Sequence, residues 1–283
     1  MRVLTAPTAF ALDEPRLTPV QIAFWRGIFA GIVLVPLLRK ADIRFHPLMP
    51  PMVLCFAIMS GLYLSALGLG NAANAILLQN TAPVWVYIIG VYLLKQPSDV
   101  RSLRSTILGM LGALIIVGGN WPTHLHGDEQ TAQIQILLMA AGSGFTYAGI
   151  VLLLHHLKSE SAAWLMVLNL LGSAACLGTF VLLQIGFDAF IEWVTAPTWQ
   201  QLLFLAVFGF VQMAAPYWLF ARGLKTVSAM EAGIITLLEP VLNPIWAYLI
   251  APDRETPTHA TFLGGGILLA ALIWRYIPAR KTV

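Results

Sequence analysis

Long apolar segments separated by short polar stretches make up most of the chain. A helix crosses the hydrocarbon of a bilayer with about 20 apolar residues at about 1.5 Å each, and about nine segments are long enough. The predicted spans are Pro19–Leu38, Pro51–Gly70, Asn71–Leu94, Leu103–Gly119, Ile134–Leu157, Ala162–Gln184, Gln201–Ala221, Ser228–Ile250 and Thr261–Ile277. A further apolar segment, Val3–Leu12, is too short to cross. The pattern predicts an all-α polytopic membrane protein.

Two predicted spans are interrupted near their middle by a proline, Pro83 in the first half of the chain and Pro240 in the second. A proline frees a backbone carbonyl, which in lipid has to find a partner in protein or trapped water. A shift of 157 residues places Pro83 on Pro240 and Gly109 on Gly266. The chain is therefore predicted to hold two copies of one five-helix unit. Because five is odd, the second copy enters the membrane from the opposite side, and the copies are inverted repeats.

The predicted domains are a first repeat over residues 1–120, an external linker over 121–133 and a second repeat over 134–283. Alignment of the repeats sets Met1 against Phe145, so the front of the first helix has no counterpart. We expect a ten-span plan whose first span is truncated. Translation starting upstream and a natural nine-span form remain the two alternatives.

Composition excludes a water-soluble domain. The chain is 58% hydrophobic and 10% charged, with a mean hydropathy of +0.79, whereas soluble domains carry about 25% charged residues. If the loop before Pro19 lies outside, only Arg16 and Arg254 fall on the outer side. The inner loops then hold Arg39, Lys40, Arg44, Lys95, Arg101, Arg104, Lys158, Arg222, Lys225, Arg275, Arg280 and Lys281. The positive-inside rule thus predicts a cytoplasmic carboxyl terminus in a plasma (bacterial inner) membrane.

Arg26 lies inside the second span, where an arginine is costly unless it is paired, hydrated or close to the interface. One interpretation is that it extends to the outer headgroups beside Trp25. The other is a cation that faces a cavity and holds a helix end or an anionic substrate group.

Glu239 and Asn243 lie on one face of the same predicted helix, beside Pro240 and Pro244. A carboxyl at that depth is protonated, hydrogen-bonded or paired with a cation such as Arg26. Bracing of the broken helix and a direct role in transport or proton coupling are the two alternatives for Glu239.

Neutral polar groups gather in the partner helix at Asn74, Gln79 and Asn80, next to Pro83. One interpretation is that each of these side chains only hydrogen-bonds to a neighbouring helix. Their concentration beside the proline favours contact of at least one with substrate. Tyr147 and Trp218 fall near mid-span and are candidates to line a cavity.

Signals of enzyme chemistry are missing from the sequence. All six histidines fall in loops or at span ends, so none is placed to activate Ser143 as an intramembrane nucleophile. Small-residue helix packing is the favoured interpretation of Gly142-Ser143-Gly144. There is no Walker A motif, and the two cysteines have no metal-ligand spacing. We therefore predict no enzyme, no cofactor and no metal.

Three segments carry a resemblance to a known family: AANAILLQNTAPVWV, LTPVQIAFWRG and LLEPVLNPIWAYL. With the Gly109 and Gly266 helices, they resemble the EamA-like branch of the drug/metabolite transporter superfamily. The resemblance implies ten spans in two inverted five-helix repeats that move small metabolites, often outward. It matches Arg26 to the arginine of the second span, Pro83 to the proline of the fourth, and Glu239-Pro240 to the Glu-Pro of the ninth.

The predicted function is a secondary transporter, an exporter of small organic metabolites such as amino acids or related solutes. It would work by alternating access between the inverted repeats. The alternative is a non-transporting membrane partner subunit or lipid-handling module. The implied partners are a small-molecule substrate, the lipid bilayer and protons as coupling ion, with no nucleic acid. For the oligomeric state, a monomer and a homodimer are the two alternatives.

Glu239→Gln tests the proton-coupling role, because the amide keeps the shape of the side chain but does not titrate. If Glu239 carries the proton, the variant folds and binds solute, keeps solute exchange, and loses accumulation driven by a pH gradient. The measurement is solute uptake into proteoliposomes with and without an imposed pH gradient. Gradient-driven transport at the wild-type rate would make Glu239 a structural residue.

Overall fold

A computed structural model describes residues 17–95, 100–123, 125–216, 219, 242–243, 245–246, 248–249 and 256–276. Every regular element within these ranges is a helix. By length and composition, six of the helices within the described ranges are able to cross a membrane, or seven if one bent pair is counted as a single span. The all-helical membrane architecture expected from the hydropathy pattern is therefore confirmed.

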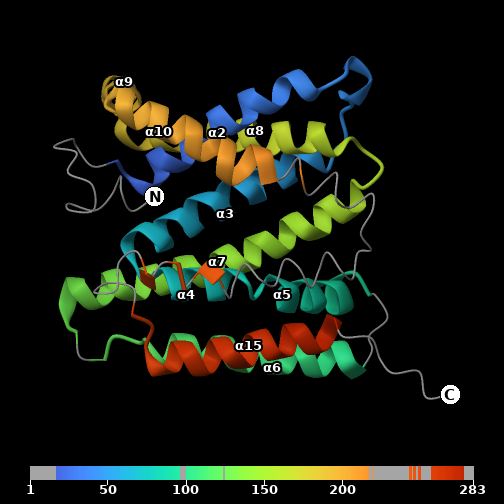
Figure 1. The fold of residues 1–283 in the computed structure, drawn as a ribbon, viewed down its shortest axis with the longest axis vertical. Coiled ribbons are helices and arrows are strands. Elements are labelled where there is room, and N and C mark those ends of the chain that lie inside the picture. The colour runs from blue at the N-terminus through green and yellow to red at the C-terminus, as the bar shows by residue number, and fades with distance from the viewer. Residues whose placement is uncertain are drawn as a thin grey trace. The chain divides into compact units, whose positions relative to one another are not determined.

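Apart from α9 and the start of α7, the main helices follow the predicted spans closely (Figure 1). They are α2 (Pro19–Leu34), α3 (Met49–Leu69), α4 (Ala72–Gln79), α5 (Ala82–Ile88), α6 (Val100–Gly119), α7 (Gly127–His156), α8 (Ala162–Ile185), α9 (Phe187–Thr195), α10 (Trp199–Gly209) and α15 (His259–Tyr276). Four short elements complete them: the 3-10 turns η1 (Val35–Leu37) and η2 (Lys40–Asp42), and the π-helices η3 (Ile89–Leu93) and η4 (Phe210–Ala214).

The two long predicted links contain helix that the hydropathy pattern did not indicate. The predicted linker over 121–133 is helical from Gly127, where α7 begins. Asp128 and Glu129 occupy the first turn of α7. Carboxylates at that position stabilise a helix by interacting with its dipole, so α7 extends beyond its apolar part. Helix α9 lies in the link between the predicted spans Ala162–Gln184 and Gln201–Ala221. Most of the predicted span Ser228–Ile250 and all of Val3–Leu12 lie outside the described residues.

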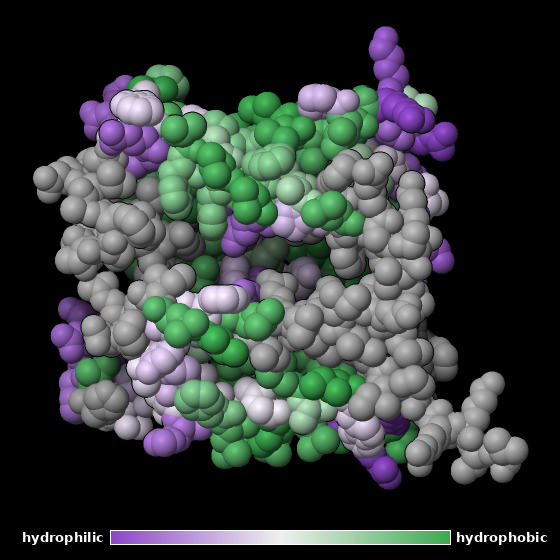
Figure 2. All heavy atoms as spheres, viewed as in Figure 1, coloured by the Kyte–Doolittle hydropathy of each residue, from purple (hydrophilic) through white to green (hydrophobic). Residues whose placement is uncertain are grey.

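The chain divides into two compact units, each of which takes segments from both halves of the sequence. The first unit comprises Met1–Gly68 and Gly149–Gly223, and the second comprises Leu69–Ala148 and Leu224–Val283. Figure 2 shows hydrophobic side chains along the sides of the helices and hydrophilic side chains at their ends, as expected for helices that cross a bilayer.

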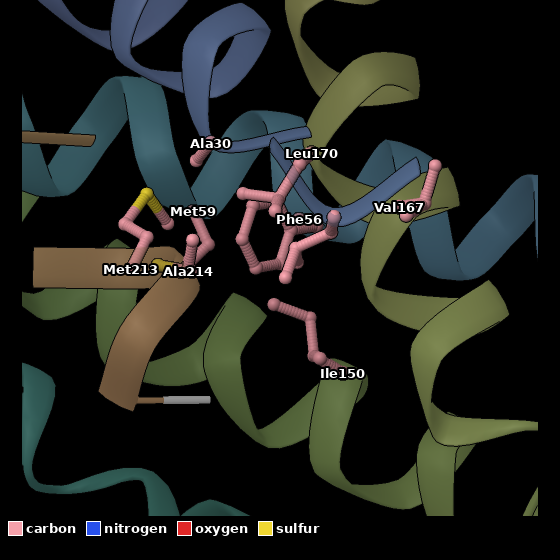
Figure 3. Close-up of a cluster of buried hydrophobic side chains, with 9 residues drawn as sticks. Ala30, Phe56, Met59, Ile150, Val167, Leu170, Met213 and Ala214 are labelled. Carbon is pink, nitrogen blue, oxygen red and sulfur yellow. The ribbon is translucent and has the colours of Figure 1, made fainter. Parts of the chain in front are cut away.

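The first unit is built around a buried core that α2, α3, α7, α8 and η4 share. Phe56 lies at its centre, with Leu170 and Ile150 against the ring (Figure 3). Helices α2 and α8 approach closely at Gly27, where an added Cβ would lie 3.1 Å from the Leu170 carbonyl oxygen. Close approach at small residues is how helices pack where lipid offers no hydrophobic driving force between them.

The second unit holds the pair α6 and α15, whose backbones meet at Gly112 and Gly264. A Cβ on either glycine would lie 2.5 Å from the carbonyl oxygen of the other. Two polar contacts fix the pair: the Ser105 hydroxyl donates to the Ala271 carbonyl at 2.7 Å, and Arg101 donates Nε and Nη2 to the Trp274 carbonyl at 3.0 and 2.6 Å. The first of these two contacts is buried between the helices.

Gly112→Ala is expected to destabilise the second unit, because the new methyl group overlaps backbone atoms of α15 and the helices have to separate. Overpacking of this kind costs about 1–3 kcal/mol. The melting temperature in detergent should fall. Gly118→Ala in the same helix is the matched control, since nothing lies within 4 Å of its added Cβ. Equal melting temperatures for the two variants would show that α6 and α15 do not meet at Gly112.

Candidate functional site: a buried arginine and a broken helix

Arg26 is held at depth by the way α2 begins. The Thr18 hydroxyl accepts from the Gln21 amide at 3.2 Å, and the Gln21 side chain accepts from the Thr18 amide at 3.3 Å, which is a capping box followed by Pro19. The start of α2 is thereby fixed, and Arg26 lies about 10 Å along the helix at about 1.5 Å per residue. Only 6% of Arg26 is exposed.

The Arg26 guanidinium contacts two side chains from the helix formed by α10 and η4. Nη1 donates to the Gln212 side-chain oxygen at 2.8 Å, and the guanidinium carbon lies 5.9 Å from the centre of the Phe208 ring. Gly209 permits this approach, because a Cβ there would lie 2.9 Å from the Arg26 carbonyl oxygen. The burial of Arg26 fits a cation that holds a neighbouring helix, not one that extends to the headgroups.

Aromatic pairs lie on the two helices that meet at Arg26. Phe208 stacks on Phe204, with ring centres 6.1 Å apart, and Trp25 stacks on Phe29 at 5.6 Å. Phe204 and Phe29 belong to helices that pack on each other, α10 and α2. A buried cation in a low-dielectric setting attracts polar or anionic groups strongly.

The predicted break at Pro83 is present, and it falls three residues earlier, at Asn80 and Thr81. Helix α4 ends at Gln79 and α5 begins at Ala82. Because a proline lacks an N–H and its ring crowds the preceding turn, the disturbance lies on its amino-terminal side. The two residues at the break satisfy nearby carbonyls with their own side chains: Asn80 donates to Ile76 at 2.9 Å and Thr81 to Leu78 at 2.7 Å.

Two other segments of the second unit cover this break. Gly144 of α7 lies against it, since a Cβ there would be 2.5 Å from the Leu78 carbonyl oxygen. Arg275 of α15 donates Nη1 to the Pro83 carbonyl at 3.0 Å. Ser143 is fully buried and donates to the Ala140 carbonyl at 2.7 Å. The Gly142-Ser143-Gly144 segment thus packs helices, as the sequence favoured.

Asn74 joins a closed set of hydrogen bonds at one end of the second unit. Its side-chain oxygen accepts from the Thr261 hydroxyl at 2.7 Å. The Asn120 amide nitrogen donates to the Thr261 hydroxyl at 3.1 Å, and Thr258 donates to the Asn120 side-chain oxygen at 3.1 Å. These bonds tie the start of α4, the end of α6 and the start of α15, so they give Asn74 a structural use. Its contact with substrate stays a prediction.

The predicted site residues fall in both units. Arg26 lies in the first unit, whereas Asn74, Gln79, Asn80, Tyr147 and Asn243 lie in the second. Gln79, Asn80 and Asn243 are partly buried, and Tyr147 is 40% exposed. Trp218, Glu239, Pro240 and Pro244 lie outside the described residues. Within those residues, no cluster of three or more His, Cys, Asp and Glu side chains suits a metal ion.

Two residues with site-like chemistry were not expected from the sequence. Gln212, the partner of Arg26, lies 186 residues away in the chain. Asn169 of α8 is 1% exposed, and in the described part of the chain neither its amide nitrogen nor its amide oxygen has a hydrogen-bond partner. Leaving such groups unsatisfied costs about 1–3 kcal/mol each. For both residues, the sequence signal that could have identified them is a polar side chain inside an apolar span.

Comparison with a family model identifies the chain's relatives. The model of the EamA-like transporter family matches residues 7–118 and 132–276, which confirms the resemblance proposed from the sequence segments. A solved crystal structure of a protein with 14% sequence identity covers 96% of this chain and 90% of its own, with a TM-score of 0.61. At that identity the likeness concerns the fold alone.

Curated relatives carry transporter names. An uncharacterized transporter of Synechocystis is 30% identical over 239 residues, covering 81% of this chain and 65% of the relative. This chain thus spans about two thirds of that protein's length. An uncharacterized transporter of Archaeoglobus fulgidus is 26% identical and covers 90% of this chain and 87% of its own. A Rickettsia prowazekii protein named an S-adenosylmethionine uptake transporter is 23% identical, over 95% of this chain and 86% of its own.

Gln212→Leu is expected to destabilise the first unit, because it removes a hydrogen-bond acceptor from the Arg26 guanidinium. A hydrogen bond to a charged group contributes about 1.5–3 kcal/mol. The melting temperature should fall, and Gln212→Glu should restore it by supplying an acceptor of opposite charge. Val211→Leu, at a neighbouring exposed position, is the control. A Gln212→Leu protein as stable as the control would mean that this bond does not hold α10 to α2.

Proposed function

Because this chain belongs to the EamA-like transporter family, we propose that it is a secondary transporter of small organic metabolites, such as amino acids or related solutes. The observation that carries the proposal is the family match over residues 7–118 and 132–276. The hydropathy of the described helices supports it, since six of them, or seven if the bent pair is counted as one span, are long and apolar enough to cross a bilayer.

Alternating access between two inverted repeats is the proposed mechanism. Two packing relations support it. Helix α2 packs on α8, and α6 packs on α15. In the predicted repeats these are corresponding helices, the second of each copy and the fifth of each copy. Contact between equivalent elements is what a pseudo-twofold relation produces. The broken helix α4–α5 supports it too, because interrupted helices form substrate sites in transporters of this design.

Arg26 is the proposed contact for an anionic group of the solute, such as a carboxylate. A carboxylate accepts two parallel hydrogen bonds from a guanidinium, which makes it a stronger acceptor than the neutral Gln212 amide. A solute carboxylate would therefore compete with Gln212 for Arg26. The Phe208 ring would then face the bound group. The two Rickettsia relatives are named as S-adenosylmethionine uptake transporters. S-adenosylmethionine carries a carboxylate, as amino acids do.

Export is the proposed direction, as the family resemblance suggests, and protons are the proposed coupling ion. Uptake is the alternative direction, and it is the one named for the two Rickettsia relatives. The proposed setting is a bacterial inner membrane with a cytoplasmic carboxyl terminus. Counterflow in inside-out and right-side-out vesicles separates the two directions.

Flux into proteoliposomes tests the proposal, with a panel of labelled amino acids and S-adenosylmethionine. We expect saturable flux of at least one solute with a carboxylate. Arg26→Gln should lower that flux by about tenfold or more, since a tenfold change corresponds to about 1.4 kcal/mol and a charged hydrogen bond contributes about 1.5–3 kcal/mol. Arg39→Gln, in an exposed loop, is the control and should keep it.

A second readout separates folding from binding in this experiment. Solute should raise the melting temperature of the wild-type protein and of Arg39→Gln, because a ligand that binds the folded state stabilises it by mass action. It should not raise that of Arg26→Gln. Absence of flux across the whole panel, in protein that is folded and inserted, would overturn the proposed transport.

A further inference from the structure

Helix α9 occupies a corner between two apolar helices. It runs from Phe187 to Thr195, directly after α8 and shortly before α10. Gly186 forms the corner with φ at 82°, a conformation that a side chain disfavours. Helix α8 has 24 residues and is therefore about 36 Å long, which exceeds the hydrocarbon thickness of about 30 Å. The chain has thus crossed the membrane by the time α9 begins.

The direction of α9 differs sharply from that of its neighbours. The angle between α9 and the helix of α10 and η4 is 78°. In Figure 1, α9 is seen nearly end-on, whereas α8 and α10 run across the view. Spanning helices tilt on average about 20° from the bilayer normal. A helix at 78° to one of them therefore lies close to the plane of the membrane.

The inner face of α9 packs against α2 within the first unit. Phe190 stacks on Trp193 with ring centres 5.8 Å apart, and Trp193 lies 5.3 Å from Phe24 of α2. The Gln21 side chain donates a hydrogen bond to the Trp193 carbonyl. These contacts fix the rotation of α9 about its own axis, so they also fix which side chains face outward.

The outward side chains of α9 fall into an apolar group and an acidic group. Phe187 is 68% exposed and Ile191 is 46% exposed, and they are four residues apart on one face. Asp188 and Glu192 are exposed about 100° further round the helix. The helix carries no Lys or Arg, so attraction to anionic headgroups is not what would hold it at a membrane.

We propose that α9 is an interfacial helix, which inserts Phe187 and Ile191 into the boundary between headgroups and acyl chains and turns Asp188 and Glu192 to water. The occupant of the exposed apolar face is lipid of the leaflet at that end of the helices, predicted to be the outer one. Both neighbours of α9 in the chain enter lipid at that level, which places the face at the boundary. Through Gln21 and Phe24, α9 also fixes the start of α2, the helix that carries Arg26.

Spin-label accessibility in liposomes tests the orientation of α9. Single cysteines at Phe187, Ile191, Asp188 and Glu192 are introduced with Cys55 and Cys176 changed to Ser. Phe180→Cys, exposed on α8, provides the lipid reference. Labels at 187 and 191 should collide with oxygen at about the rate of the reference and be several-fold less accessible to a nickel chelate than labels at 188 and 192. Their depth should be about 5–10 Å below the headgroups.

The test has two results that overturn the proposal. If all four positions are equally open to the nickel chelate, α9 stands in water. If 187 and 191 are shielded from both reagents, protein covers the face instead of lipid. Benzoylphenylalanine at position 187, in the chain with its native cysteines, gives a second measurement that does not depend on the substitutions. A lipid adduct after irradiation supports the proposal, and an adduct only to protein or none at all contradicts it.

Discussion

Backbone carbonyls and amides have to be satisfied inside the protein wherever a chain crosses hydrocarbon, and this constraint shapes the second unit. A proline in a spanning helix removes one donor and disturbs a full turn. At the break, the side chains of Asn80 and Thr81 donate to carbonyls of the preceding turn, and Arg275 donates to the Pro83 carbonyl. At Gly144, the backbone of α7 packs closely against the same turn. The broken helix is thus held by its own side chains and by two other segments, α7 and α15.

In the first unit, the buried polar group is a charged side chain, and the neighbouring helix accommodates it. Arg26 brings a charge into an apolar bundle, and the neighbouring helix adapts to it. Gly209 lets the backbones approach, Phe208 offers a ring face, and a π-helix carries Gln212 to the guanidinium. π-Helices are uncommon and are frequently found at functional sites. The position of the charge therefore coincides with the irregular part of the helix opposite.

The sequence predicted more of the fold than of the site, for a physical reason. Hydropathy reports length and polarity, which were enough to find spans such as α3 and α8 within a few residues. It does not report which face of a helix meets which neighbour, so Gln212 was not connected to Arg26. Pro83 indicated a break, yet the position of the break followed from the turn before it. Helix α9 was missed because a short amphipathic helix has neither the length nor the uniform polarity that hydropathy detects.

The π-helix η4 makes the environment of Arg26 depend on chain length. Hydrogen bonds in a π-helix skip one more residue than in an α-helix, so η4 accommodates a residue that a regular helix would not hold. A chain one residue shorter between Gly209 and Ala215 would close this segment into a regular α-helix and leave the residues after it on nearly the same faces relative to α10. Phe208, which precedes the junction, would keep its place over the guanidinium, while a different side chain would replace Gln212. A single inserted or deleted residue here would thus change the partner of the buried charge and leave the orientation of the rest of the helix nearly unchanged.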